Sequence, residues 1–196
     1  MVGLGRACIS ACWRLGLLAV AIAILFETTR TISAGPPDKK PREGAEPSID
    51  VLFSPDGGCE ARIVAEVGEA KKRIRVQMYI FNSKAIAEAI IAAKKRDVIC
   101  EIIADKSEEA KVYGRLPSLS RAGVKVLIDA EHEVANNKIM LIDDDTVITG
   151  SYNYTKAAEE KNAENLLFIK NHAEVFGKYS ANYDSHKAHA KPYQRP

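Results

Sequence analysis

The 196-residue sequence contains little cysteine, little net charge and no apolar run of typical membrane-spanning length. Of its four cysteines, two lie in an N-terminal segment that is expected to be removed, which leaves Cys59 and Cys100. Two cysteines alone do not make a zinc site, and in a chain of this size they are expected to be buried thiols, although export would permit a disulfide. The composition has no bias of the kind that marks collagen, a coiled coil or wholesale disorder.

Positive charge is also not in excess. The formal net charge is +2, and removal of residues 1–34 takes away three arginines and one glutamate, which leaves 25 basic and 25 acidic residues. Proteins that bind nucleic acid often carry a strong positive excess. The balance therefore argues against a protein that coats nucleic acid, but it is compatible with an enzyme that has a local phosphate pocket.

The N-terminal apolar run covers twelve residues, Leu15–Phe26, and follows Arg6 and Arg14. A helix of that length measures about 18 Å, which is short for a hydrocarbon core of about 30 Å. The run and the small residues after it predict a cleaved export signal over residues 1–34, and hence a periplasmic or secreted protein. The alternative is an uncleaved membrane anchor in which residues 8–13 extend the span.

Beyond this segment the chain divides into a linker and one domain. Residues 35–47 contain four prolines and two glycines and predict a linker. From Ser48 onwards, short β-rich runs alternate with helical ones. Strands are expected at 49–53, 74–81, 98–104, 124–128, 138–142, 147–149 and 166–169, and helices at 60–70, 84–95, 108–122, 156–161 and 173–183. The alternation predicts an α/β fold with a mixed β-sheet sandwiched by helices, in a domain at 48–190, with the end of the chain frayed and residues 191–196 as a tail.

A group of polar residues surrounds a predicted hairpin. Alternate side chains of a strand share a face, so Asn136 and Lys138 point the same way, as do Ser151 and Asn153. The hairpin brings the two pairs together beside Gly150, which would let the backbone approach a bound group. An ammonium, an amide and a hydroxyl that converge on one spot suit a phosphate, because one supplies charge and the others supply directed donors.

These residues belong to a longer pattern, in which Lys138 is followed after four residues by Asp143 and then by Gly150-Ser-x-Asn153. The pattern resembles the phospholipase D superfamily motif, His-x-Lys-x4-Asp followed by Gly-Ser-x-Asn. Three further sequence segments resemble those of small secreted endonucleases of the Nuc type and their Zucchini-like relatives. They are Phe53–Gly58, Ala104–Ser107 and Thr155–Asn165. The similarity covers roughly residues 50–172.

The resemblance implies a role for each matching residue. Lys138 and Asn153 would bind the scissile phosphate with a hydrogen bond from Ser151, Asp143 would be a supporting acid, and Glu164 would orient the catalytic imidazole. The family mechanism uses two histidines, a nucleophile that forms a phosphohistidine and an acid, and requires no metal or other cofactor. The chain has one motif copy and no internal repeat, so the resemblance implies a twofold homodimer with a shared active site.

The departure from the family pattern is Asn136, which stands two residues before Lys138, where the motif has its histidine. An amide is not a nucleophile near neutral pH and cannot transfer protons as imidazole does. His132 lies four residues away, roughly 13 Å along an extended chain, and is expected to be a loop residue rather than a replacement. His186 and His189 suggest a metal site, but solvated tail residues are the preferred interpretation.

Three functions remain open on this evidence. A nuclease acting on DNA or RNA is favoured by the small size, the single motif and the Nuc-like phrases. A phospholipase D acting on phospholipid would be supported by an exposed apolar patch near the site. A non-catalytic phosphodiester-binding protein is favoured by Asn136, although an inactivating substitution introduced to trap a substrate would leave the same pattern. Tyr152 and Tyr154 either stack on a base or pack at a strand end.

Overall fold

The computed structural model describes residues 45–111 and 114–194. The predicted export signal at 1–34 and most of the predicted linker at 35–47 lie outside these residues. In the part of the chain that is described, no helix has the length and apolar character needed to cross a membrane.

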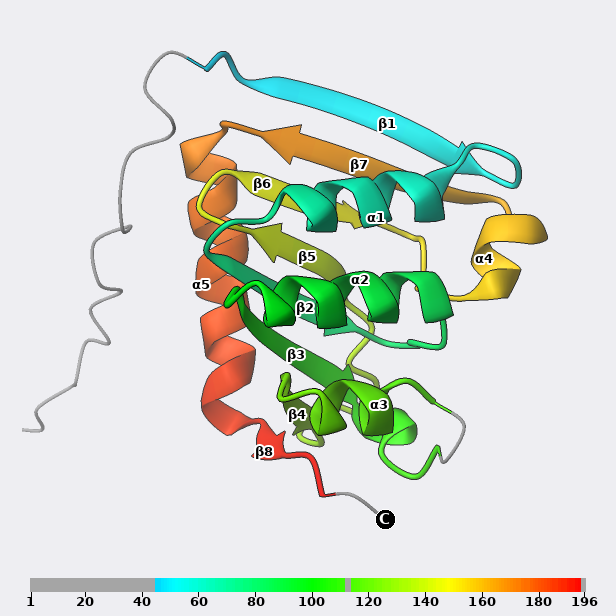
Figure 1. The fold of residues 1–196 in the computed structure, drawn as a ribbon, viewed down its shortest axis with the longest axis vertical. Coiled ribbons are helices and arrows are strands. Elements are labelled where there is room, and N and C mark those ends of the chain that lie inside the picture. Colours follow the sequence, from blue (N-terminus) through cyan, green and yellow to red (C-terminus); the bar gives the residue numbers. More distant parts are fainter. Residues whose placement is uncertain (1–44, 112–113, 195–196) are drawn as a thin grey trace, which may run out of the picture. The chain divides into compact units, whose positions relative to one another are not determined.

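An eight-stranded mixed sheet organises the domain (Figure 1). Its strands are β1 (Ser48–Ser54), β2 (Arg73–Met78), β3 (Ile99–Asp105), β4 (Lys125–Asp129), β5 (Lys138–Ile142), β6 (Thr146–Gly150), β7 (Glu164–Lys170) and β8 (Lys191–Pro192). The order across the sheet is β1-β7-β6-β5-β2-β3-β4-β8. The pairs β2–β3 and β3–β4 are parallel, and the other neighbours are antiparallel.

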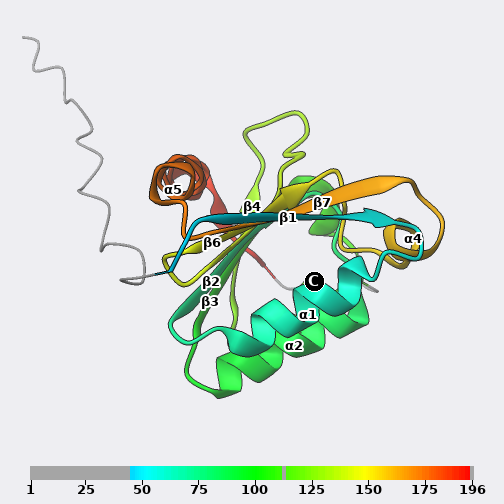
Figure 2. The ribbon, with the colours of Figure 1, turned by 90° about the horizontal axis from the view of Figure 1, so that it is seen from above.

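Helices cover both faces of the sheet. They are α1 (Cys59–Glu69), α2 (Lys84–Lys95), α3 (Leu116–Arg121), α4 (Lys156–Glu160) and α5 (Ala173–His189), with a short 3-10 helix, η1, at Lys106–Glu108. Figure 2 shows α5 on the side of the sheet opposite α1 and α2. The parallel strands are therefore buried on both faces, which explains the apolar run Ile102–Ala104 in β3. The arrangement confirms the predicted fold class.

Helix α2 shows how closely the sequence determines a local element. The Ser83 hydroxyl caps its first turn by accepting a hydrogen bond from the Ile86 N–H at 3.1 Å. Ile86 and Ile90, four residues apart, are fully buried on the face that packs against the sheet. Lys94 and Lys95 lie in the last turn, where cations interact favourably with the helix dipole. The prediction of a helix over 84–95 is confirmed.

The two remaining cysteines belong to the core rather than to a bridge. Cys59 begins α1 and Cys100 lies in β3; both are buried and both are free thiols, as expected. Burial raises the pKa of the Cys100 thiol to about 11, because the thiolate form would lose its hydration. Neither thiol therefore has the reactive, low-pKa surroundings of a catalytic cysteine.

One predicted helix is much shorter in the structure. The pattern over 108–122 predicts a continuous helix, but α3 begins only at Leu116. Pro117 lies in its first turn, which is where a helix accepts a proline, since an earlier start would require the missing N–H as a donor. Among the described residues from Lys106 to Arg115, the chain forms only η1, turns and bends.

The prediction of a frayed C-terminal end is wrong. Helix α5 continues to His189, and residues 191–192 then pair as β8 with β4. Phe176 and Tyr183 anchor the helix against the sheet, because they are buried in one apolar cluster with Leu141 of β5. The sequence gives a weak helical signal here, since the buried positions are few and widely spaced.

Candidate active site

Three neighbouring strands carry predicted site residues to one end of the sheet. Lys138 is the first residue of β5, Gly150 is the last of β6 and Glu164 is the first of β7. Ile139 pairs with Thr149, so Lys138 lies opposite Gly150 on strands about 5 Å apart. The residues that follow Gly150 therefore leave the sheet beside Lys138, as the predicted hairpin requires.

The Lys138 ammonium is held in place by two residues. Its Nζ donates hydrogen bonds to the Asn136 backbone oxygen, at 2.8 Å, and to the Asn136 side-chain oxygen, and it lies 5.3 Å from the centroid of the Tyr79 ring. Burial lowers the pKa of Lys138, and the negative charge of Glu164 opposes this shift. The Asn136 and Tyr79 contacts are uncharged, so the positive charge of Lys138 is not neutralised by them. A phosphate oxygen could take the place of the Asn136 side-chain oxygen as the acceptor from Lys138 Nζ.

Ser151 and Glu164 form a fixed pair next to the lysine. The Ser151 hydroxyl donates to Glu164 Oε2 at 2.6 Å and accepts from the Asn165 N–H at 3.1 Å. Asn162 Nδ2 donates to the other carboxylate oxygen at 3.1 Å. Because a hydroxyl has one proton, Ser151 must turn away from Glu164 before it can donate to a phosphate.

Gly150 is required by the packing of the strands. A Cβ at this position would lie 2.2 Å from the Asn165 backbone oxygen, which itself accepts a hydrogen bond from the Ser151 N–H at 3.1 Å. The sequence suggested that the missing side chain at Gly150 lets a bound group approach the backbone. The structure shows instead that it lets the backbone of β7 approach.

Asn153 is half-buried and presents a buried amide oxygen. Its Oδ1 is buried and makes no hydrogen bond to any residue within 45–111 and 114–194. Such a group is costly unless a ligand completes it, and rotation of the amide exchanges its donor and acceptor. Lys138 and Asn153 thus bring a cation and an incompletely bonded amide to the same end of the sheet.

The tyrosines on either side of Asn153 are structural. Tyr152 donates from its hydroxyl to Glu159 Oε2 at 2.7 Å, and Tyr154 packs edge-to-face on Phe81 with ring centroids 5.4 Å apart. Both rings are almost completely buried. They therefore pack in the core and have no exposed face for stacking on a base.

Asp105 anchors the loop that carries Asn136, a role that sequence reasoning missed. Its carboxylate accepts from the Ala135 N–H at 2.7 Å and from the Ser107 N–H at 2.8 Å. Burial of the carboxyl opposes its ionisation, but these hydrogen bonds lower the pKa of Asp105 overall. An aspartate at the end of a buried strand, two residues before a serine, is the signal that could have revealed it.

Asp143 lies apart from the other predicted site residues. It follows β5, roughly 16 Å from Lys138 along the strand. Its carboxylate accepts from three successive backbone N–H groups, those of Lys71 at 3.1 Å, Lys72 at 2.7 Å and Arg73 at 3.1 Å. Asp143 thus fixes the connection between α1 and β2.

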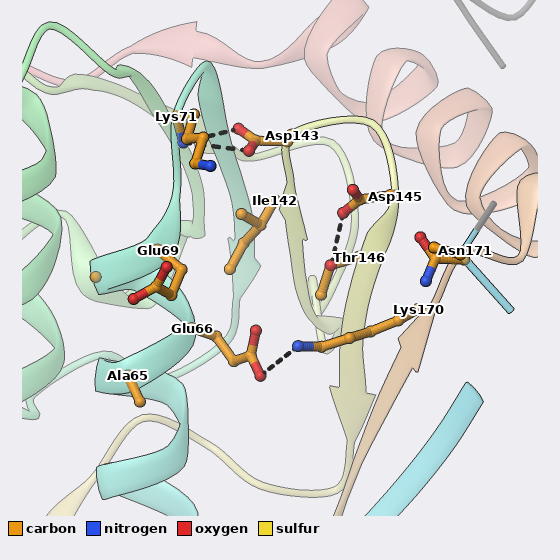
Figure 3. A pocket seen from close by; sticks show the side chains of 12 residues that line it. Ala65, Glu66, Glu69, Lys71, Ile142, Asp143, Asp145, Thr146, Lys170 and Asn171 are labelled. Carbon is orange, nitrogen blue, oxygen red and sulfur yellow. Dashed lines mark hydrogen bonds and ion pairs between the residues drawn. The ribbon is translucent and has the colours of Figure 1, made fainter. Parts of the chain in front are cut away.

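A pocket of about 560 Å³ lies at this same end of the sheet (Figure 3). Lys170 Nζ forms an ion pair across it with Glu66 Oε1 at 2.7 Å, and Thr146 donates to Asp145 Oδ1 at 2.8 Å. Two of its charged groups are therefore paired with each other, and the strands separate it from Lys138. This pocket is therefore not the predicted phosphate site, which lies around Lys138.

The histidines form a separate group. Three of the four in the sequence, His132, His186 and His189, surround the fully buried carboxylate of Asp129, and their nitrogens offer potential metal ligands. Asp129 ends β4, three strands from β5, which places the group about 14 Å from Lys138. The interpretation of His186 and His189 as solvated tail residues is wrong, because α5 includes both. His132 is a loop residue, as expected.

Comparison with known proteins identifies the family. The family model for "Cardiolipin synthase, PLD-like domain" matches residues 63–187, which is more than half of the chain. The chain belongs to the phospholipase D superfamily. It is 36% identical to the phospholipase D of Rickettsia bellii over 140 residues, which cover 71% of this chain and 69% of that protein. It is 29% identical to the mitochondrial cardiolipin hydrolase of Xenopus laevis over 121 residues, which cover 62% of this chain and 54% of that protein.

Two solved structures share the fold of this chain. The crystal structure of Nuc, a phospholipase D family member from Salmonella typhimurium, matches with a TM-score of 0.72 and 30% identity, over 77% of this chain and all of that one. NucT from Helicobacter pylori shares the fold at 22% identity, with a TM-score of 0.69, over 76% of this chain and all of that one. The superfamily, the fold and the residues around Lys138 together identify a phosphodiesterase scaffold.

Proposed function

We propose that this phospholipase D superfamily protein binds a phosphodiester between Lys138 and Asn153, and that Asn136 limits its cleavage. The observation that carries the proposal is the buried, unpartnered Asn153 Oδ1 at the end of the sheet where the Lys138 ammonium is held. The cation would attract the phosphate, and the amide would orient it. Glu164, already oriented by two donors, would hold the imidazole of a histidine at position 136.

Nucleic acid, DNA or RNA, is the substrate we propose. The likeness to Nuc covers the whole of that chain, and both the resemblance and the single motif copy favour an endonuclease. With a histidine at position 136, the reaction would pass through a phosphohistidine and need no metal. Two chains would share one site in a twofold dimer, and the protein would act after export, in the periplasm or outside the cell.

Asn136 supports a binding protein with little or no turnover. Its side-chain oxygen accepts from Lys138, but an amide can neither attack phosphorus nor protonate the leaving oxygen. In a symmetric dimer the same residue would be lost from both halves of the shared site. General acid–base catalysis alone contributes about 10²–10⁴-fold, and loss of the nucleophile adds to that.

A phospholipid substrate is the second candidate, because an exposed apolar stripe lies next to the site. Ile49, Val51 and Phe53 of β1 are 64%, 44% and 62% exposed. The register pairs Phe53 with Asn165 and the following residue with Glu164, so the stripe ends beside the candidate site. Such a stripe could contact a membrane surface. The name of the Rickettsia relatives agrees with this alternative.

The test compares the chain with its Asn136→His variant on four substrates: single-stranded DNA, double-stranded DNA, RNA and phospholipid vesicles. Buffers contain no added divalent cation. We expect the parent to bind oligonucleotide with little cleavage, and Asn136→His to cleave at least about 100-fold faster. Faster cleavage of vesicles than of nucleic acid would establish the lipid alternative. Rapid cleavage by the parent would contradict the role given to Asn136.

The shared site has its own test. Sedimentation of the purified chain at micromolar concentration should give the mass of a dimer. An Asn136→His protein that sediments as a monomer and still cleaves DNA would overturn the dimer while leaving the phosphate site intact. A matched Asn137→His variant, one residue along the same loop, controls for the mere addition of an imidazole.

A further inference from the structure

Four side chains from three segments meet at the edge of the sheet where β4 ends. Asp129 is the last residue of β4, His132 lies in the loop that leads to β5, and His186 and His189 lie in the last turn of α5. One potential ligand atom from each lies within 4.8 Å of all the others. We call this group the Asp129 cluster.

The distances within the Asp129 cluster resemble those of a tetrahedral metal site. Asp129 Oδ2 is 2.7 Å from His186 Nδ1, 3.0 Å from His132 Nδ1 and 3.3 Å from His189 Nε2. Ligand atoms that bind zinc at 2.0–2.1 Å in a tetrahedron lie about 3.3 Å from one another. Small rotations of the imidazoles would therefore bring all four atoms onto one ion.

Hydrogen bonding alone leaves the Asp129 cluster incomplete. His132 and His186 are hydrogen-bonded to the carboxylate, but His189 Nε2 is buried and makes no hydrogen bond to any residue in the described segments. The three ring centroids are only 4.7–5.4 Å apart, so one ion could contact all three rings. A single metal ion would use this nitrogen, which makes no hydrogen bond, together with those of the other two rings.

The chemistry of the donors selects the kind of ion. The Asp129 carboxylate is fully buried and lies within 2.7–3.3 Å of nitrogens from all three histidines. Three imidazole nitrogens and one carboxylate oxygen suit zinc and similar divalent transition metals better than calcium or magnesium. Glu131 Oε2 lies 3.6 Å from His189 Nδ1, where an outer carboxylate commonly orients a metal-binding histidine.

We propose that Asp129, His132, His186 and His189 form a structural site for a divalent transition metal, with Zn²⁺ as the best fit. Four protein ligands close the coordination sphere, as in structural rather than catalytic zinc sites. The ion would fasten the end of α5 to β4, next to β8 (Figure 1). It would also fix the start of the loop that carries Asn136, because His132 is both a ligand and, through its backbone oxygen, an acceptor from Lys106 Nζ at 2.9 Å.

The Asp129 cluster is separate from the residues proposed to bind phosphate. The Asp129 cluster and Lys138 lie on strands about 14 Å apart, and no ligand of the cluster is among the residues proposed to bind phosphate. The metal would therefore affect stability and loop position directly, and cleavage only through the loop. Metal binding can be measured whether or not the chain cuts any substrate.

The test uses the full chain without a histidine tag, freed of metal by a chelator and transferred to metal-free buffer. Titration calorimetry should give one Zn²⁺ per chain, and the melting temperature should rise by roughly 5–10 °C at free Zn²⁺ about 100 times Kd. His132→Ala, His186→Ala and Asp129→Asn should each weaken binding by at least about 100-fold. His172→Ala, at the other end of α5, is the matched control and should bind as the parent does.

Co²⁺ supplies a readout that does not depend on stability. The parent should give the intense visible absorption of tetrahedral Co²⁺, and His132→Ala should lose it. The His132 side chain is 45% exposed, so its removal should leave the fold intact even if Asp129→Asn does not fold. Failure of the parent to take up one Zn²⁺, an octahedral Co²⁺ spectrum, or an equal loss in His172→Ala would each overturn the site.

Discussion

Two charged residues of one sequence motif, Lys138 and Asp143, lie at opposite ends of β5 and have different surroundings. At one end, the Asp143 carboxylate accepts from three backbone N–H groups and is only 6% exposed. At the other end, the Lys138 ammonium contacts Asn136 and a tyrosine ring, and Asn153 Oδ1 is buried without a partner in the described chain. Fully bonded polar groups stabilise a fold, whereas incompletely bonded ones are available to a ligand. The motif therefore combines a stabilising residue with a binding residue.

The largest effect should come from removing the cation at the binding end. In the active Asn136→His background, Lys138→Met should lower the rate of phosphodiester cleavage by about 10²–10³-fold, because the charge that stabilises the phosphate is lost. The melting temperature should change little. Cleavage assays and thermal unfolding measure the two properties. Lys156→Met, on the exposed face of α4, is the matched control, and an equal loss of activity there would contradict a specific role for Lys138.

At the opposite end, Asp143→Ala should act on stability. Three backbone N–H groups would lose their acceptor, and the free energy of unfolding should fall by about 3 kcal/mol. Oligonucleotide binding by the remaining folded protein should be unchanged. Urea denaturation and a binding titration test both halves of the expectation. If Asp143→Ala left stability unchanged and weakened oligonucleotide binding, Asp143 would be a binding residue rather than a stabilising one.

Gly150→Ala tests the backbone contact that shapes the binding end. The new methyl group would lie against the Asn165 backbone oxygen, at a position where φ is +155°, and should destabilise the domain by about 1–3 kcal/mol. Binding should weaken as well, since Ser151 would move with the strand. Gly68→Ala, where an added Cβ meets nothing within 4 Å, is the control and should be neutral or slightly stabilising. A fully stable Gly150→Ala protein would refute the proposed contact.

The smallest effect is expected for Asp144→Ala, directly after Asp143. Burial raises the pKa of Asp144, but Arg73 and Lys72 lower it overall. A carboxyl with a lowered pKa stabilises the fold above its ordinary pKa, about 4, and loses this contribution as the pH falls. Because these are ion pairs near the surface, the loss at pH 7 should be below about 1 kcal/mol and should vanish near pH 2. Denaturation at both pH values measures it.

The sequence predicted the fold class and most elements, because these depend on local periodicity and on strand order. Helix α2 and strand β5 were predicted with the observed bounds. The role of Asp143 and the reason for Gly150 were not predictable, since each depends on a backbone contact with a distant segment. The same holds for the Asp129 cluster, because 54 residues separate His132 from His186 and only the register of α5 against β4 brings them together.

The two edge strands of the sheet, β1 and β8, differ in their ability to pair with a strand of another molecule. At β8 the margin is two residues long and ends in Pro192, which has no N–H to offer to a further strand. At β1 the margin is seven residues long, and no strand in residues 45–111 or 114–194 pairs with its outer side. A β-strand from another molecule, whether in productive assembly or in aggregation, would therefore pair with β1 and extend the sheet there. It would not pair with β8.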